Sequence, residues 1–373
     1  MLLRSCFVLV DIERIIGNFF IDGEFQSSEC YGNGHINDTY AATYIMSDGK
    51  LRRFIFQRVN HNIFSEPEKL MSNVENVTAF LRKKILARGG NPERETLNLI
   101  PTNEGVCYQD SEHDFWRGYV FIENATSYQT VEKPEHFYAA GKAFGNFQNM
   151  LDDYPADTLY ETLKDFHNTK KRFDTFVEIL DKDCFNRASK VNDEIDFILK
   201  RADDVTVLTD LLDEDLIPLR VTHNDTKLNN VMIDDVTGEG LCVIDLDTVL
   251  PGLSLYDFGD AIRFGANPGE EDERDLSKVW MELSLFDQFS RGFLESCGAS
   301  LNKTELEYLP MASKIMTFEC GMRFLTDYLD GDSYFKIHFD HHNLDRARTQ
   351  FKLVADMETK MDEMSKIVRK YGR

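Results

Sequence analysis

Between Leu219 and Asp260, short apolar runs alternate with polar side chains that stand where each run ends. The stretch reads LRVTHNDTKLNNVMIDDVTGEGLCVIDLDTVLPGLSLYDFGD. Residues 223–230 are mostly polar and follow the first run, and Asp245 and Asp247 close the third. Burying so many carboxylates and amides side by side is unfavourable by several kcal/mol unless each has a partner or a metal. The stretch is therefore either a satisfied structural network or a functional site.

The composition is that of a globular protein and argues against several classes of partner. Of 373 residues, 42% are hydrophobic and 29% charged, and the formal net charge is −23. Nucleic acid and anionic membranes need a positive protein surface, so neither is expected as a partner. Seven scattered cysteines without CxxC spacing argue against a disulfide framework or a zinc site. No apolar run approaches the ~18 residues of a membrane span and no signal-peptide cleavage site is evident, so we expect a cytoplasmic protein.

The first part of the chain has the pattern of a small sheet with one helix packed on it. Asp48-Gly49 between two strand-like runs predicts a hairpin turn. Apolar residues at helical spacing, with Pro67 near the start, predict a helix over residues 66–88. Strands are predicted at residues 40–45, 53–59, 96–101, 106–109 and 115–122.

After residue 122 the pattern changes to long helices, which residues 214–260 interrupt with short strands. Helices are predicted over residues 134–151, 157–166, 169–180, 195–212, 275–296, 303–330 and 345–370. The sequence thus predicts an α+β protein with a β-rich N-lobe, residues 1–122, and a larger, mainly helical C-lobe, residues 123–373, which contains the polar stretch.

The polar stretch contains the pattern H-x-D-x-x-x-x-N, formed by His223, Asp225 and Asn230. Phosphoryl transfer needs a carboxylate that orients a hydroxyl and takes its proton, and an oxygen ligand that holds a metal. Asp225 and Asn230 are of these types, and Asp245 can be the anionic metal ligand. Mg²⁺ prefers one or two such protein oxygens, completed by phosphates and water. Each residue alone can also cap a turn, but the three together favour a site.

The other polar residues of the stretch have more structural interpretations. His223 is expected to bridge the loop to nearby backbone and not to transfer protons. Asp247, two residues after Asp245, is either a second metal ligand or a solvated acid. Asp257 and Asp260 are expected to cap and orient. Asp257 begins the letters DFG, but it follows Asp245 by 12 residues, so Asp245 stays the predicted metal ligand.

A glycine-rich turn with the sequence GNGHIN, residues 32–37, lies between predicted strands of the N-lobe. Glycine permits close approach and positive φ, so the N–H groups of such a turn can surround phosphates. Taken alone, the pattern is more typical of an ordinary hairpin turn. Motifs of two other enzyme classes are missing: Gly141-Lys142-Ala143 lacks the other residues of a P-loop, and the segment 252–256 fails to match GxSxG.

Two features of the predicted helices have structural alternatives. His338 and His342 are spaced i,i+4 and could bind a metal, but a solvated histidine cluster is preferred because no HExxH accompanies them. Glu319 and Arg323 lie in a strongly apolar segment, where charged groups must be paired or face a cavity. We expect either an internal ion pair or a polar wall of a substrate pocket, and the two are compatible.

Several stretches resemble a known family. HNDTKLNN followed by VIDLDTVLPG resembles the phosphotransfer loop of the aminoglycoside phosphotransferase and choline kinase superfamily, which has a protein-kinase-like two-lobe fold. The chain is also similar to the N-acetylhexosamine 1-kinases of that superfamily over most of residues 31–353, in YGNGHINDTY, FGNFQN, PLRVTHNDTKLNNVM, IDLDTVLPG, DFGDAIRFGA, EDERDL and ECGMRFLTDYLDGDSYF. The resemblance implies phosphorylation of the anomeric hydroxyl of N-acetylglucosamine or N-acetylgalactosamine, with ATP and Mg²⁺ as cofactors.

The resemblance also implies roles for single residues. The implied roles are catalysis by Asp225, magnesium binding by Asn230 and Asp245, and nucleotide binding by Gly32, Gly34 and Glu123. Gln57 is expected to bind the nucleotide as the equivalent of the kinase lysine, and His35 and Arg323 are expected to bind the sugar because of their positions near the predicted cleft.

The chain departs from the protein-kinase pattern at the residue that holds the nucleotide phosphates. Protein kinases carry a lysine on the third N-lobe strand, and here this strand reads FIFQRV, residues 54–59. Either Gln57 or Arg58 takes the place of that lysine, because both faces of the strand are apolar and alternation cannot choose. A kinase of another small alcohol, such as choline, homoserine or an aminoglycoside, and a non-catalytic nucleotide-binding module are the alternative functions.

Overall fold

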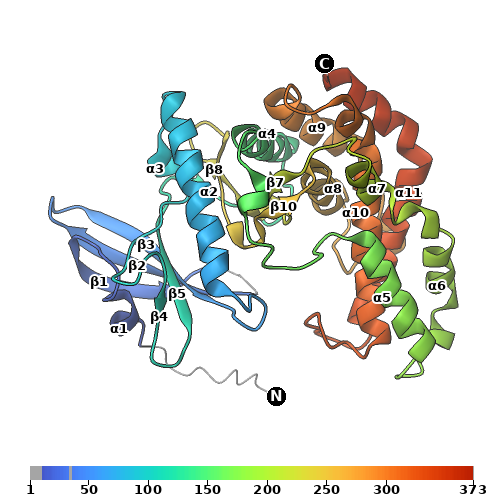
Figure 1. The fold of residues 1–373 in the computed structure, drawn as a ribbon, viewed down its shortest axis with the longest axis horizontal. Coiled ribbons are helices and arrows are strands. Elements are labelled where there is room, and N and C mark those ends of the chain that lie inside the picture. The colour runs from blue at the N-terminus through green and yellow to red at the C-terminus, as the bar shows by residue number, and fades with distance from the viewer. Residues whose placement is uncertain (1–10, 33–35, 373) are drawn as a thin grey trace. The chain divides into compact units, whose positions relative to one another are not determined.

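The computed structural model describes residues 11–32 and 36–372 of the chain. The chain divides into two compact units, Met1–Asn124 and Ala125–Arg373 (Figure 1). None of the helices in these described ranges combines the length and apolarity that crossing a bilayer requires.

The first unit is built on an antiparallel five-stranded sheet with the order β1-β2-β3-β5-β4. Its strands are β1 (Gly23–Cys30), β2 (Asp38–Met46), β3 (Leu51–Val59), β4 (Tyr108–Gln109) and β5 (Phe115–Val120). The β2–β3 hairpin turns at Gly49, whose φ of 79° suits glycine, so the predicted hairpin is confirmed. One face of the sheet buries Phe54, Phe56 and Trp116 against Ile15 and Ile16 of helix α1 (Ile12–Ile16).

Helix α2 (Pro67–Ala87) confirms the helix predicted for this unit, and the short helix α3 (Pro92–Glu95) follows it. The buried apolar positions of α2 recur at helical spacing, from Leu70 through Val74 and Val77 to Leu81. The sequence does not predict β1, because this strand is largely exposed and pairs only with β2. Residues 96–101 are not a strand and contribute only an isolated bridge between Leu99 and Tyr119.

The second unit is mainly helical and contains two small sheets. Its helices are α4 (Pro134–Met150), α5 (Thr169–Lys182), α6 (Asn192–Leu199), α7 (Val207–Asp213), α8 (Ser254–Gly265), α9 (Leu283–Cys297), α10 (Lys303–Leu329) and α11 (His342–Tyr371). Its strands β6 (Ala125–Thr126), β8 (Val231–Asp234) and β9 (Gly240–Val243) form one sheet, and β7 (Arg220–Thr222) pairs with β10 (Leu250–Gly252). Helix α10 contacts α5, α8 and α11, and its buried Phe318, Met322 and Leu325 are part of the core of this unit (Figure 1).

Helices α4 and α9 approach each other closely through glycine. A Cβ added at Gly141 would lie 2.4 Å from the carbonyl oxygen of Phe289, and one added at Gly145 would lie 2.4 Å from that of Phe293. Gly141 is therefore required for helix packing, which agrees with the rejection of a P-loop at this position.

Three predicted helices are partly or wholly wrong. Residues 157–166 form only a 3₁₀ turn, Ala156–Thr158, followed by irregular turns. The predicted helix over residues 195–212 is divided into α6 and α7, and the one predicted from residue 275 begins only at Leu283. In that last segment the N–H of Met281 donates to a carboxylate of α11, so a tertiary contact overrides the local pattern. The predicted α+β class is confirmed, with the antiparallel sheet in the first unit and most helices in the second.

Candidate active site

The start of the polar stretch forms one loop between β7 and β8 of the second unit, and Asp225 lies near its centre. Asn224 has a φ of 64°, a left-handed conformation that asparagine tolerates better than most residues. The side-chain Nδ2 of Asn230 donates hydrogen bonds to the backbone oxygen of Asp225 at 2.8 Å and to its Oδ2 at 3.1 Å. Asp225 and Asn230 are therefore in direct contact.

Asp245 follows β9 and is held beside this loop by its neighbour Ile244. The N–H of Ile244 donates to the backbone oxygen of Asn230 at 2.9 Å, and its carbonyl oxygen lies 2.9 Å from Nε2 of His223. His223 thus bridges the loop to nearby backbone, as predicted. Asp245 is exposed, whereas Asp247 is 4% exposed and is not a solvated acid. The structure brings Asp225, Asn230 and the chain at Asp245 together.

Two carboxylates of α8 hold the backbone of the loop. Asp257 accepts the N–H of His223 at 3.0 Å and that of Asn224 at 2.8 Å, and Asp260 accepts the N–H of Thr226 at 2.9 Å. Burial raises the pKa of Asp257 above its ordinary value. The expectation that Asp257 and Asp260 orient the loop is confirmed.

Lys227 belongs to this loop and is not among the predicted site residues. Its Nζ lies 2.8 Å from Oδ1 of Asp225. The negative charge of Asp225 raises the pKa of Lys227, which keeps the ammonium charged. An ammonium at this place can stabilise negative charge on a transferred phosphoryl group. The spacing D-x-K in the sequence is the feature from which this pair could have been predicted.

A buried network of hydrogen bonds supports the loop from the side of α10. His167 lies 3.1 Å through Nε2 from the backbone oxygen of Asn224, and 2.9 Å through Nδ1 from Oε1 of Glu319. Thr169 donates to the other oxygen of Glu319 at 2.7 Å. Burial favours a raised pKa for Glu319, but the hydrogen bond and charge of His167, followed by the charge of Arg323, lower it. Glu319 thus has His167 and Thr169 as its partners, and it does not form an ion pair with Arg323.

Arg323 lies on α10 one turn after Glu319 and is half-buried. The carbon at the centre of its guanidinium is 5.7 Å from the ring centre of Phe166 and 5.5 Å from that of Phe335. Because Phe166 directly precedes His167, Arg323 lies near the network that contacts the loop.

The structure distinguishes Gln57 from Arg58 on β3. Gln57 lies opposite Arg117 of β5, which donates to Gln57 Oε1 through Nε at 3.0 Å and through Nη2 at 2.8 Å. Nη1 of Arg117 contacts the sulfur of Met71 on α2, so Gln57 is on the face of the sheet that α2 covers. Arg58 points to the opposite face and pairs with Asp114 at 3.0 Å. Gln57 is therefore the residue that faces the helix.

The remaining predicted nucleotide-site residues belong to the first unit as well. Gly32 has a φ of 74°, which favours glycine. Gly34 and His35 lie outside the described residues. Glu123 follows β5 and pairs with Arg53, with 3.0 Å between Oε1 and Nε, while its backbone oxygen accepts a hydrogen bond from Arg94 at 2.9 Å.

The oxygen atoms of the loop fit a hard metal ion. In the part of the chain that the structure describes, no cluster of three or more His, Cys, Asp or Glu side chains could hold a metal. Mg²⁺ needs only one or two protein oxygens when phosphates and water complete its shell. Asn230 donates hydrogen bonds to Asp225 through its Nδ2, which leaves its Oδ1 as an acceptor. Asp245 is exposed and directly follows Ile244, whose N–H is bonded to Asn230. An amide oxygen and a carboxylate thus meet the requirement.

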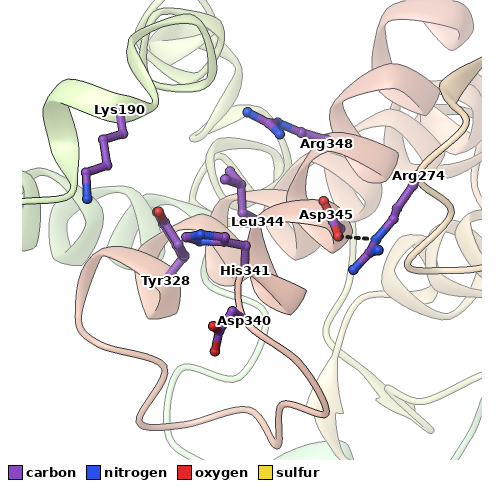
Figure 2. A pocket seen from close by; sticks show the side chains of 8 residues that line it. All are labelled: Lys190, Arg274, Tyr328, Asp340, His341, Leu344, Asp345 and Arg348. Atoms are coloured by element: carbon purple, nitrogen blue, oxygen red, sulfur yellow. Dashed lines mark hydrogen bonds and ion pairs between the residues drawn. The ribbon is translucent and has the colours of Figure 1, made fainter.

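A separate pocket of about 400 Å³ lies at the start of α11 (Figure 2). Both of its arginines are paired: Arg274 with Asp345 at 2.9 Å, and Arg348 with Glu194 at 2.6 Å. The pocket contains none of the predicted site residues. The neighbouring His342 is buried and lies 2.9 Å from a carboxylate oxygen of Asp272, so the prediction that it is solvated is wrong.

Comparisons with known proteins agree with this fold. Among solved structures, a microcompartment-associated aminopropanol kinase is 12% identical, with a TM-score of 0.56 over 95% of this chain and 98% of that chain. An ethanolamine kinase of Plasmodium vivax is 16% identical, with a TM-score of 0.55 over 87% and 82%. An amicoumacin kinase in complex with AMP-PNP and Ca²⁺ is 12% identical, with a TM-score of 0.57 over 94% and 92%. The fold is that of the small-molecule kinases.

A family model described as APH, phosphotransferase enzyme family, matches residues 32–281, which is more than half of the chain. The chain belongs to this family.

Proposed function

We propose that this protein transfers the γ-phosphoryl group of ATP to the anomeric hydroxyl of an N-acetylhexosamine and releases the sugar 1-phosphate and ADP. The observation on which the proposal rests is the contact between Asp225 and Asn230, with Asp245 fixed beside them by Ile244. The choice of acceptor is supported by the similarity of several stretches to N-acetylhexosamine 1-kinases.

The reaction uses Asp225 to orient the C1 hydroxyl and to accept its proton as the new P–O bond forms. Lys227, 2.8 Å from Asp225, offers positive charge to the phosphoryl group in transfer. Asn230 and Asp245 would hold Mg²⁺, which when bound supplies positive charge to the β- and γ-phosphates. The carboxylates of α8 keep the loop in position throughout.

For the nucleotide we assign Gly32, Gly34, Gln57 and Glu123. Gln57 is neutral where protein kinases carry a lysine, and its Oε1 is bound to the guanidinium of Arg117. The buried guanidinium of Arg117 therefore places positive charge beside Gln57 and holds its side chain in position. For the sugar we assign His35 and Arg323.

The test is a panel of acceptors offered to the purified full-length chain with ATP and Mg²⁺, with release of ADP as the measurement. N-acetylglucosamine or N-acetylgalactosamine should give the highest kcat/KM, above choline, homoserine and an aminoglycoside. Asp225→Asn supplies the background of ATP hydrolysis. Preference for choline or an aminoglycoside would overturn the sugar assignment, and nucleotide binding without turnover of any acceptor would indicate a non-catalytic module.

A further inference from the structure

Two arginines from different helices come together at Phe166, next to the network that supports the loop. Nη2 of Arg172, on α5, donates to the backbone oxygen of Phe166 at 2.9 Å. The guanidinium of Arg323, on α10, lies 5.7 Å from the ring centre of the same residue. The next residue, His167, is hydrogen-bonded to the backbone of Asn224, which precedes the proposed catalytic Asp225.

Within the described part of the chain, neither of these two arginines forms a contact ion pair, and the carboxylates of Glu319 and Asp165 act on Arg172 only from a longer distance. Neither guanidinium has a carboxylate within 4 Å among the described residues, and Nε of Arg172 is buried without a hydrogen-bond partner. The oxygens of Glu319 are both engaged, by His167 and Thr169. Burial, followed by the like charge of Arg323, lowers the pKa of Arg172. In a chain of net charge −23, a concentration of positive charge with an unsatisfied donor indicates a place for a ligand.

The chemistry of the two side chains defines the ligand group. Guanidinium groups donate hydrogen bonds and accept none, so they bind carbonyl, hydroxyl or carboxylate oxygens. A guanidinium repels an ammonium because both are positively charged. Sites for cationic ligands are built instead from acidic or aromatic groups. The rings of Phe166 and Phe335 beside Arg323 provide apolar surface for the carbon face of a ligand.

We propose that Arg172, acting together with Arg323, is a specificity determinant that selects oxygen-rich, neutral or anionic acceptors and rejects amino alcohols. The inference rests on the proposed function, since it assumes that the loop at Asp225 phosphorylates an acceptor hydroxyl. It separates this chain from kinases of similar fold whose acceptors are aminopropanol and ethanolamine.

The test compares an N-acetylhexosamine with the 2-amino-2-deoxyhexose of the same ring, which carries an ammonium in place of the acetamide. An ammonium about 6 Å from one guanidinium is disfavoured about 10²-fold at an effective dielectric constant of about 20. The wild-type ratio of kcat/KM, acetamido over amino sugar, should therefore be high. Arg172→Met should lower this ratio at least about 10-fold, and Arg172→Lys should restore most of it because the charge is kept.

Arg274→Met is the matched control, because Arg274 also lies over a phenylalanine ring but in the pocket of Figure 2. It should leave both substrates unchanged. Thermal melting followed by circular dichroism checks that the variants are folded. An equal loss of kcat/KM for both sugars in Arg172→Met and Arg323→Met would overturn the proposal.

The acceptor that the wild-type protein prefers distinguishes failure of this specificity proposal from failure of the sugar assignment. Preferential phosphorylation of choline, ethanolamine or an aminoglycoside would overturn the specificity proposal. Phosphorylation of a neutral or anionic alcohol that is not a hexosamine would overturn the sugar assignment and support the selection against ammonium.

Discussion

Replacement of Asp257 by Asn tests whether α8 holds the loop that contains Asp225 in place. The wild-type carboxylate accepts the N–H groups of His223 and Asn224 and a side-chain N–H of Gln148, and all three contacts are buried. An asparagine amide has one acceptor oxygen. In either orientation its NH₂ group faces one of the two backbone N–H groups, which is then buried without an acceptor.

Such an unsatisfied donor costs about 1–3 kcal/mol, and the loss of a charge-assisted hydrogen bond adds about 1 kcal/mol. Burial disfavours the charged form of Asp257 and raises its pKa. Removal of the charge therefore offsets part of this loss of stability. We therefore expect Asp257→Asn to lower the free energy of unfolding by about 2–3 kcal/mol. Since the loop carries Asp225, kcat should fall by at least about 10-fold.

Urea unfolding followed by circular dichroism at 222 nm measures the stability, because most helices belong to the second unit. Steady-state kinetics measures kcat. Asp235→Asn makes the same chemical change at an exposed residue of this unit and should alter the stability by less than about 0.5 kcal/mol. If Asp257→Asn matches this control in both stability and kcat, α8 does not hold the loop.

Three further predictions concern single groups. Asp225→Asn should lower kcat by about 10²-fold or more while KM for ATP stays within about 3-fold, since it removes the proposed proton acceptor and its ion pair with Lys227 but none of the residues assigned to the nucleotide; kinetics at the wild-type rate would contradict this role. Arg117→Met should raise KM for ATP by about 10-fold, because it removes the positive charge beside Gln57 and the hydrogen bonds that orient Gln57; an unchanged KM would show that Arg117 does not act on the nucleotide site. The folded-state pKa of Glu319 lies below its ordinary value of 4.5, so its carboxylate adds stability above pH 4.5 that is lost as the pH falls below it. Glu319→Gln should therefore flatten the acid side of the pH dependence of the unfolding free energy, and equal slopes in both proteins would refute this.

The loop could be predicted from sequence because its signals are local. The spacing of Asp225 and Asn230 places both on one short segment. Asp245 follows β9, which pairs with β8 directly after this segment, and its neighbour Ile244 is hydrogen-bonded to Asn230. The supporting roles of Asp257 and His223 follow from the expense of burying polar groups without partners.

The surroundings of the loop depend on contacts between distant parts of the chain. Apolar spacing predicts a helix over residues 157–166, yet Asp165 adopts a φ of 55° and the segment is irregular there. That conformation leads into Phe166 and His167, whose partners lie on α10 and in the loop. Similarly, only the pairing of β3 with β5 shows that Gln57 and Arg117 share a face. Such contacts leave no pattern in the local sequence.

Whether the acceptor is the anomeric hydroxyl is tested most directly by ³¹P NMR of the product formed from ATP and N-acetylglucosamine. A phosphate on C1 couples to the single anomeric proton, so we predict a doublet that collapses when that proton is decoupled. A phosphate on C6 couples to two protons, and the resulting triplet would contradict the proposed reaction.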